Sequence, residues 1–131
     1  MAMQALHLVI CLLFAAILGE AGLTKLMGRS TPAWFAEKFA SSWLAPIPAP
    51  LLWWPIAIAE LAVAALFIAA VVTGESAAGS AHALTQAALV GASALFAALT
   101  MGLRLSQDFA GASAALSYFG VAALLAATMF R

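Results

Sequence analysis

Four long apolar stretches, each with at most two charged residues, are the feature that most constrains this chain. They run over about residues 3–27, 51–72, 83–103 and 109–130. A helix needs about 20 residues to cross the hydrocarbon core of a bilayer, and each stretch reaches that length. None shows the apolar–polar alternation of a membrane β-strand. The sequence therefore predicts an all-α fold: an integral membrane four-helix bundle that forms one domain over residues 1–131.

Composition agrees with a membrane protein and excludes several other classes. Hydrophobic residues make up 66% of the 131 residues and charged residues only 8%, whereas a soluble domain has about 25% charged residues. The formal net charge is zero, so we expect no nucleic-acid partner. The single cysteine, Cys11, argues against an internal disulfide and a cysteine-rich metal site. The first stretch lacks a basic start and a suitable cleavage site, so we interpret it as a helix and not as a signal peptide.

The connection between the first two stretches has a pattern of its own. Ser30-Thr31-Pro32 is a helix-start signal, in which a hydroxyl caps the helix and proline occupies the first turn. Four aromatic residues then fall on one broad helical face: Trp34, Phe35, Phe39 and Trp43. This pattern predicts a short amphipathic helix over about residues 32–44 at the membrane interface. Three prolines are expected to carry extended chain into the second span, namely Pro46, Pro48 and Pro50.

The positions of the basic residues predict the orientation in the membrane. Four of the five lie in or beside the first and third connections: Lys25, Arg29, Lys38 and Arg104. The fifth, Arg131, lies on the side of the termini and the second connection. Because positively charged loops stay in the cytoplasm, we expect both termini to lie outside it.

Glu60 is the charged residue that membrane topology does not explain. It lies near the middle of the second stretch, where insertion of a charge costs about 2.5–3.5 kcal/mol. Ala57 and Ala64 place small side chains on the same helical face, which favours packing of that face against other helices. Two interpretations stay open. Glu60 either fixes helix packing as a protonated or hydrogen-bonded group, or belongs to a ligand or proton site.

Other polar residues in the spans are further candidates. Glu20 and Lys25 lie five residues apart on the first helix, a spacing that is not ideal for a direct pair. Both are candidates for a polar site, and the alternative is that Lys25 is an anchor at the interface beside an interfacial acid. The third stretch carries a stripe at alternating spacings of four and three residues: Gln86, Val90, Ser93, Ala97, Thr100 and Arg104. If it faces Tyr118 of the fourth stretch, a polar seam crosses the bundle, and a phenol at that depth needs a partner. The simpler alternative for Arg104 is an ion pair with Asp108 across the tight turn between these stretches.

The two histidines, His7 and His82, lie near the outer ends of the first and third stretches. Two histidines on facing helices are able to hold a haem. Histidines are also ordinary at the membrane interface near helix ends, so a haem is not needed to explain these two and is disfavoured. We also find no motif that predicts a metal site or a phosphate-binding loop.

Two short motifs resemble those of the DoxX-like family of small four-helix membrane proteins. They are Gly22-Leu23-Thr24-Lys25-Leu26 at the end of the first stretch and Ile58-Ala59-Glu60-Leu61-Ala62 in the second, which a Thr73-Gly74 break follows. Chain length, the number of spans and the long first connection are similar to the family over nearly the whole chain. Members include the small membrane subunits of thiosulfate:quinone oxidoreductase, and others associate with redox or thiol-stress enzymes.

The resemblance implies a small subunit of a quinone-linked redox complex in a bacterial inner membrane, which anchors a protein partner. Quinone is the expected ligand, and the expected ligand-binding residues are Glu60, Tyr118, Glu20, Lys25 and Arg104. Catalysis by the chain alone is not expected. The alternative is a structural or assembly subunit with no ligand of its own. A transporter is disfavoured because the sequence shows no internal repeat and no broken midplane helix.

Overall fold

Five helices make up the part of the chain that a computed structural model describes, namely residues 2–28, 30–74 and 83–129. They are α1 (Ala2–Met27), α2 (Ala33–Phe39), α3 (Ala49–Val72), α4 (Ala83–Leu105) and α5 (Phe109–Met129). No strand occurs in these described ranges, and α2 lies between the first two long helices as expected. The structure thus confirms the all-α fold class and the bundle of four long helices.

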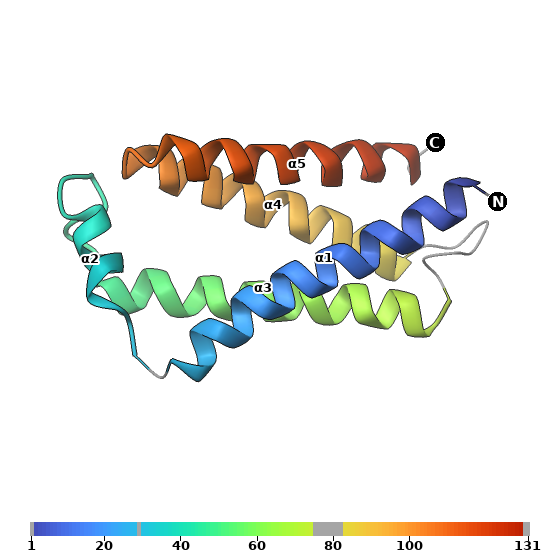
Figure 1. The fold of residues 1–131 in the computed structure, drawn as a ribbon, viewed down its shortest axis with the longest axis horizontal. Helices are drawn as coiled ribbons and strands as arrows, with labels where there is room; N and C mark the ends of the chain where they lie inside the picture. Colours follow the sequence, from blue (N-terminus) through green and yellow to red (C-terminus); the bar gives the residue numbers. More distant parts are fainter. Residues whose placement is uncertain (1, 29, 75–82, 130–131) are drawn as a thin grey trace.

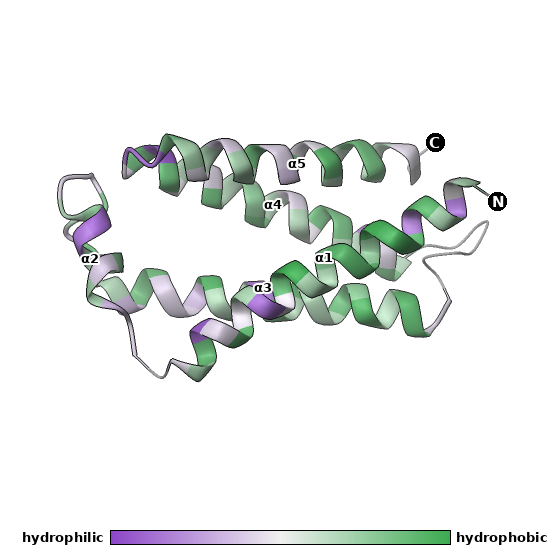
Figure 2. Cartoon of the chain, in the orientation of Figure 1, coloured by the Kyte–Doolittle hydropathy of each residue, from purple (hydrophilic) through white to green (hydrophobic). Residues whose placement is uncertain are grey.

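The four long helices are long and apolar enough to cross a membrane. Only 33% of the apolar window of α1 and of α3 is buried in the protein, and 28% of that of α4 and of α5. Many large apolar side chains of these helices are exposed, which suits a lipid surrounding and not water. Figure 2 shows hydrophilic residues at α2, at the α4–α5 turn, near the crossing of α1 and α3 and near the start of α1. The chain is therefore a multi-pass membrane protein in contact with the bilayer.

The long helices form two pairs, α1 with α3 and α4 with α5, and contacts between α3 and α4 join the pairs. The two termini lie at one end of the bundle, and α2 lies at the opposite end beside the α4–α5 turn (Figure 1). The short turn after Leu105 makes α4 and α5 antiparallel neighbours, as the sequence predicts.

Aromatic and small side chains build the core between these pairs. The ring of Phe14 lies 5.6 Å from that of Phe67 and 5.8 Å from that of Phe96, so three helices meet at one residue. Gly91 lets α4 approach Val63, because a methyl group there would lie 3.2 Å from a valine carbon. Close approach of this kind holds helices together in lipid, where apolar burial gives little driving force.

The first connection differs from its prediction in three details. The interfacial helix α2 ends at Phe39 and not near residue 44, because the following residues form hydrogen-bonded turns in which Ser42 Oγ donates to the Phe39 carbonyl at 2.8 Å. Pro32 occupies its N-cap position, and no side chain caps the helix. Pro50 lies within the first turn of α3 and not in extended chain. Proline is tolerated there because its missing N–H would have no partner in a first turn.

Candidate functional site

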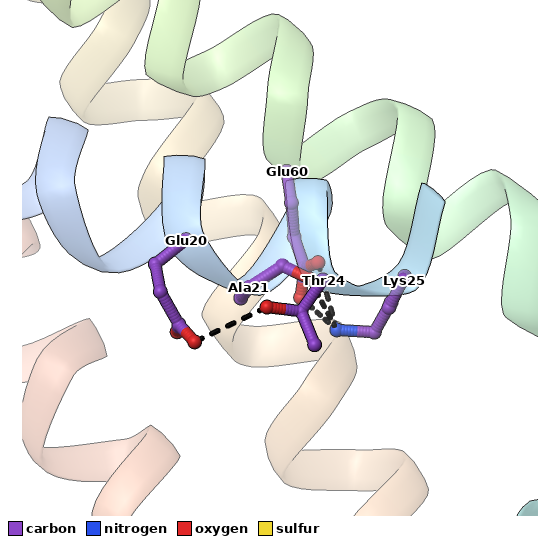
Figure 3. Close-up of polar contacts among 5 residues, drawn as sticks. All are labelled: Glu20, Ala21, Thr24, Lys25 and Glu60. Carbon is purple, nitrogen blue, oxygen red and sulfur yellow. Dashed lines mark hydrogen bonds and ion pairs between the residues drawn. The ribbon is translucent and has the colours of Figure 1, made fainter. Parts of the chain in front are cut away.

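An ion pair inside the bundle joins the last turn of α1 to the middle of α3. The Lys25 ammonium donates to both carboxylate oxygens of Glu60, at 3.1 Å and 2.9 Å, and lies 3.5 Å from the Ala21 carbonyl oxygen (Figure 3). The Glu60 side chain is only 4% exposed, whereas that of Lys25 is 19% exposed. Glu60 therefore faces inward, as its alanine neighbours predict, and Lys25 is the member that a ligand reaches more easily.

Gly22 brings the two helices close enough for this pair to form. A side-chain carbon at Gly22 would lie 2.7 Å from Leu61 Cγ and 3.2 Å from the Ala57 carbonyl oxygen. Gly22 and Lys25 are three residues apart and so share a helical face, as do Ala57 and Glu60. The two motifs that resemble the DoxX-like family thus meet each other at the crossing of α1 and α3.

Glu20 does not pair with Lys25, as their five-residue separation predicts. Thr24 Oγ1 donates to Glu20 Oε1 at 3.2 Å, while Lys25 is directed to α3 (Figure 3). A separation of five residues turns two side chains about 140° apart on a helix, which leaves them on different faces. Lys25 also does not extend along the helix end as an interfacial anchor, because Glu60 holds it.

Trp53 flanks the ion pair on the side of α2. The Lys25 ammonium lies 5.4 Å from the centroid of its ring, within the range of a cation–π contact. The Trp34 and Phe35 rings of α2 pack edge-on against Trp53, with centroids 5.7 Å and 4.8 Å away. The Trp53 Nε1 atom is buried and finds no hydrogen-bond acceptor within the described residues. Trp53, Ala57 and Glu60 have helical spacing, which is the sequence signal for this neighbourhood.

Two hollows adjoin Lys25, and Trp34 and Trp53 line both of them. The first, here the apolar hollow, has a volume of about 380 Å³ and lies between α2, α3 and α4. Its walls include Phe35, Phe39, Ile56, Leu95 and Leu99, and its cations are Lys25 and Lys38. The second, the polar hollow, has a volume of about 350 Å³ and includes Glu20, Thr24 and Ser30. Lys25 thus lies between an apolar space inside the bundle and a polar space beside α1.

Arg104 and Asp108 do not form the pair that the turn favours. Asp108 Oδ2 instead accepts a hydrogen bond from Lys38 of α2 at 2.7 Å, and the Arg104 guanidinium lies 5.3 Å from the Phe109 ring centroid. Asp108 Oδ1 also accepts from the Gly111 backbone N–H at 3.0 Å, which caps the start of α5. The hydrogen bond from Lys38 and that from Gly111 hold the pKa of Asp108 below its usual value. Lys38 and Asp108 are 70 positions apart, so no local pattern predicts their contact.

Tyr118 and Arg104 lie away from the Lys25–Glu60 pair. Tyr118 is 38% exposed on α5, and its ring lies 5.3 Å from that of Phe96. The expected polar seam is absent from the described part of α4. Val90, Ala97 and Arg104 are exposed there, and the hydroxyls of Ser93 and Thr100 donate to carbonyls of their own helix. The face of α4 that packs inward is instead the apolar one around Ala88, Ala92 and Phe96.

Only one of the two histidines considered as haem ligands lies in the described part of the structure. His7 Nε2 lies 3.3 Å from Thr128 Oγ1, a contact between α1 and α5 near the termini. His82 lies outside the described residues.

Comparisons with known proteins identify no relative of this chain. No family model matches the chain, and neither the curated proteins nor the solved structures contain a match. The resemblance to the DoxX-like family therefore stays a prediction from two short motifs.

Proposed function

We propose that this protein is a small membrane subunit of a quinone-linked redox complex and that the apolar hollow binds the quinone ring. The observation that carries the proposal is the placement of the Lys25 ammonium at the wall of a hollow lined by aromatic and aliphatic side chains. Ligand sites in proteins have this character: a mostly apolar space of about 300–1,000 Å³ with a few well-placed polar groups. Quinone is a flat apolar ring whose carbonyl oxygens accept hydrogen bonds.

Lys25 and Glu60 have different roles in this proposal. Lys25 donates to a quinone carbonyl, because it is the more exposed member and lines the hollow. Glu60 is the positioning residue, since its two oxygens hold the ammonium in place and balance its charge within the membrane. Tyr118 and Arg104 do not line the hollow, so the proposal gives them no role in binding.

The wider assignment rests on the sequence. The charge distribution supports cytoplasmic first and third connections with both termini outside, and the family resemblance supports a bacterial inner membrane and a protein partner that carries out the oxidoreductase reaction.

The test is quinone binding by the purified protein in lipid nanodiscs. We expect a short-chain ubiquinone analogue to quench tryptophan fluorescence and Lys25→Met to weaken its binding about tenfold or more, since a hydrogen bond from a charged donor contributes about 1.5–3 kcal/mol. The double variant Lys25→Met/Glu60→Gln removes both charges. It leaves neither charge without its partner, so we expect it to fold and its binding to be measurable. Arg104→Met is the matched control, because it removes a cation outside the hollow. Binding by the double variant as tight as that of the natural protein would refute the site.

A structural or assembly subunit is the second candidate, and a specific observation favours it. The Lys25–Glu60 pair is satisfied within the protein and fastens α1 to α3, as expected of a group that fixes helix packing. Under this alternative no quinone binds, and the double variant changes only stability.

A further inference from the structure

The short helix α2 closes one side of the apolar hollow. Trp34, Phe35, Lys38 and Phe39 of its seven residues line that space, and the opposite walls come from α3 and α4. In Figure 1, α2 lies at the end of the bundle, apart from the packed middle of the four long helices. Access to the hollow from this end therefore depends on where α2 lies.

The attachments of α2 to the bundle are separate from the main core. Phe35 and Phe39 form a small cluster with Trp53, distinct from the large cluster around Phe14 that holds the long helices together. Segments with their own small cluster and little buried contact open locally without global unfolding. We therefore expect α2 to open while the four-helix bundle stays intact.

One ion pair ties this element to the start of α5. Lys38 Nζ lies 2.7 Å from Asp108 Oδ2, and Asp108 stands at the start of α5, where it also caps the helix. The two side chains are 26% and 33% exposed, so the pair lies at the surface of the bundle. Lys38 also lies 5.8 Å from the Trp34 ring centroid, which places the ammonium beside the aromatic face of its own helix.

The packing of α2 on Trp53 leaves a buried hydrogen-bond donor without an acceptor in the described part of the chain, and displacement of α2 relieves this. Trp53 packs beneath Trp34 and Phe35, and its Nε1 donor is buried without an acceptor among the described residues. An unsatisfied buried donor costs free energy. Displacement of Trp34 and Phe35 removes two of the rings that cover Trp53 and so opens a route to this donor. The ion pair opposes that tendency, which is the arrangement of a latched gate.

We propose that α2 is a gate over the apolar hollow and that the Lys38–Asp108 ion pair is its latch. The identity of the gated ligand rests on the proposed function, whereas the opening of α2 does not. The latch is a charge contact at the surface, so its loss shifts the balance toward the open gate without disrupting the bundle.

The first experiment measures opening without any ligand. Hydrogen–deuterium exchange of the amides in residues 33–39 is compared in nanodiscs for the natural protein and for Asp108→Asn, in which asparagine still caps α5. We expect exchange to become roughly two- to fivefold faster, the effect of losing one exposed ion pair. Lys38→Met removes the same pair from the other side and is expected to give the same change. Glu37→Gln is the matched control, since it removes a neighbouring charge on α2 that forms no ion pair with a described residue.

The second experiment measures release of a short-chain ubiquinone analogue, and its outcomes separate the two proposals. Release that is two- to fivefold faster in both latch variants, together with faster exchange, supports the gate and its ligand. Faster exchange in a protein that binds no quinone supports the gate and refutes the proposed function. Exchange of residues 33–39 that is unchanged in both latch variants overturns the gate, whatever the protein binds.

Discussion

Removal of one partner of the Lys25–Glu60 pair tests whether this contact is a buried attraction. At 2.9 Å and an effective dielectric constant of about 20, the gross attraction is about 6 kcal/mol, most of which the desolvation of two charges cancels. Loss of Lys25 alone leaves a buried carboxylate without its cation, which typically costs about 3–5 kcal/mol. Loss of both charges leaves none of that penalty.

Protonation sets a ceiling on the cost in the Lys25→Met variant. A carboxyl group of usual pKa, about 4.3, takes up a proton at pH 7 at a cost of about 3.7 kcal/mol. We therefore expect Lys25→Met to lower the free energy of unfolding by about 3 kcal/mol at pH 7, within this ceiling, and by about 1.4 kcal/mol less for each unit of decreasing pH. Lys25→Met/Glu60→Gln is expected to remain within about 1 kcal/mol of the natural protein.

The assay is reversible unfolding in bicelles, followed by tryptophan fluorescence at pH 5, 6 and 7. Arg104→Met is again the control, because Arg104 is exposed and its guanidinium contacts the Phe109 ring instead of a carboxylate in the described structure. A penalty for Lys25→Met that equals that of the control would refute the buried attraction. A penalty that does not change with pH would refute the argument that an uncompensated carboxylate causes it.

Three further predictions use the same preparations. Gly22→Ala is expected to lower the free energy of unfolding by about 1–3 kcal/mol, because its methyl group would lie 2.7 Å from Leu61 Cγ; an unchanged value in the bicelle assay would contradict the close crossing. Asp108 has a lowered pKa, so its contribution is present above the unfolded value of 3.8 and is lost as the pH falls through the still lower folded value. Exchange of the α2 amides, corrected for the intrinsic rate, is therefore expected to be constant from about pH 8 to 5 and to rise only below pH 3.8; a rise near neutral pH would count against the latch. Tyr118→Phe is expected to leave quinone affinity unchanged, because the ring contact with Phe96 remains and the phenol does not line the apolar hollow; a clear loss of affinity would move the site toward α5.

The spans were predictable because length and hydropathy are local properties of the sequence. The α3 helix begins two residues before its predicted start and ends at Val72 as predicted, and Gly74 follows with a φ of +77°. The inward face of Glu60 was also predictable, since the alanines at helical spacing mark a face that packs closely.

The partners of the charged residues were not predictable, because they depend on how the helices pack. Lys25 lies at the end of α1, where the sequence leaves an anchor at the interface as an open alternative, yet the crossing at Gly22 sets this end beside the middle of α3. Asp108 has Arg104 near it in sequence, yet it binds Lys38, which the first connection brings to the same end of the bundle. Spacing along one helix therefore gave the inward face of Glu60 correctly, but it misplaced the inward face of α4 and did not give the partners in the ion pairs.

The two ion pairs differ in depth, and this difference determines which part of the protein moves. The Lys25–Glu60 side chains are 19% and 4% exposed, and removal of one partner leaves a charge that lipid and core do not solvate. The Lys38–Asp108 side chains are 26% and 33% exposed, so water solvates each charge when the pair separates. Separation of α1 from α3 is thus far more costly than displacement of α2. Under thermal motion α2 opens first, while the Lys25 ammonium stays fixed at the wall of the hollow that α2 uncovers.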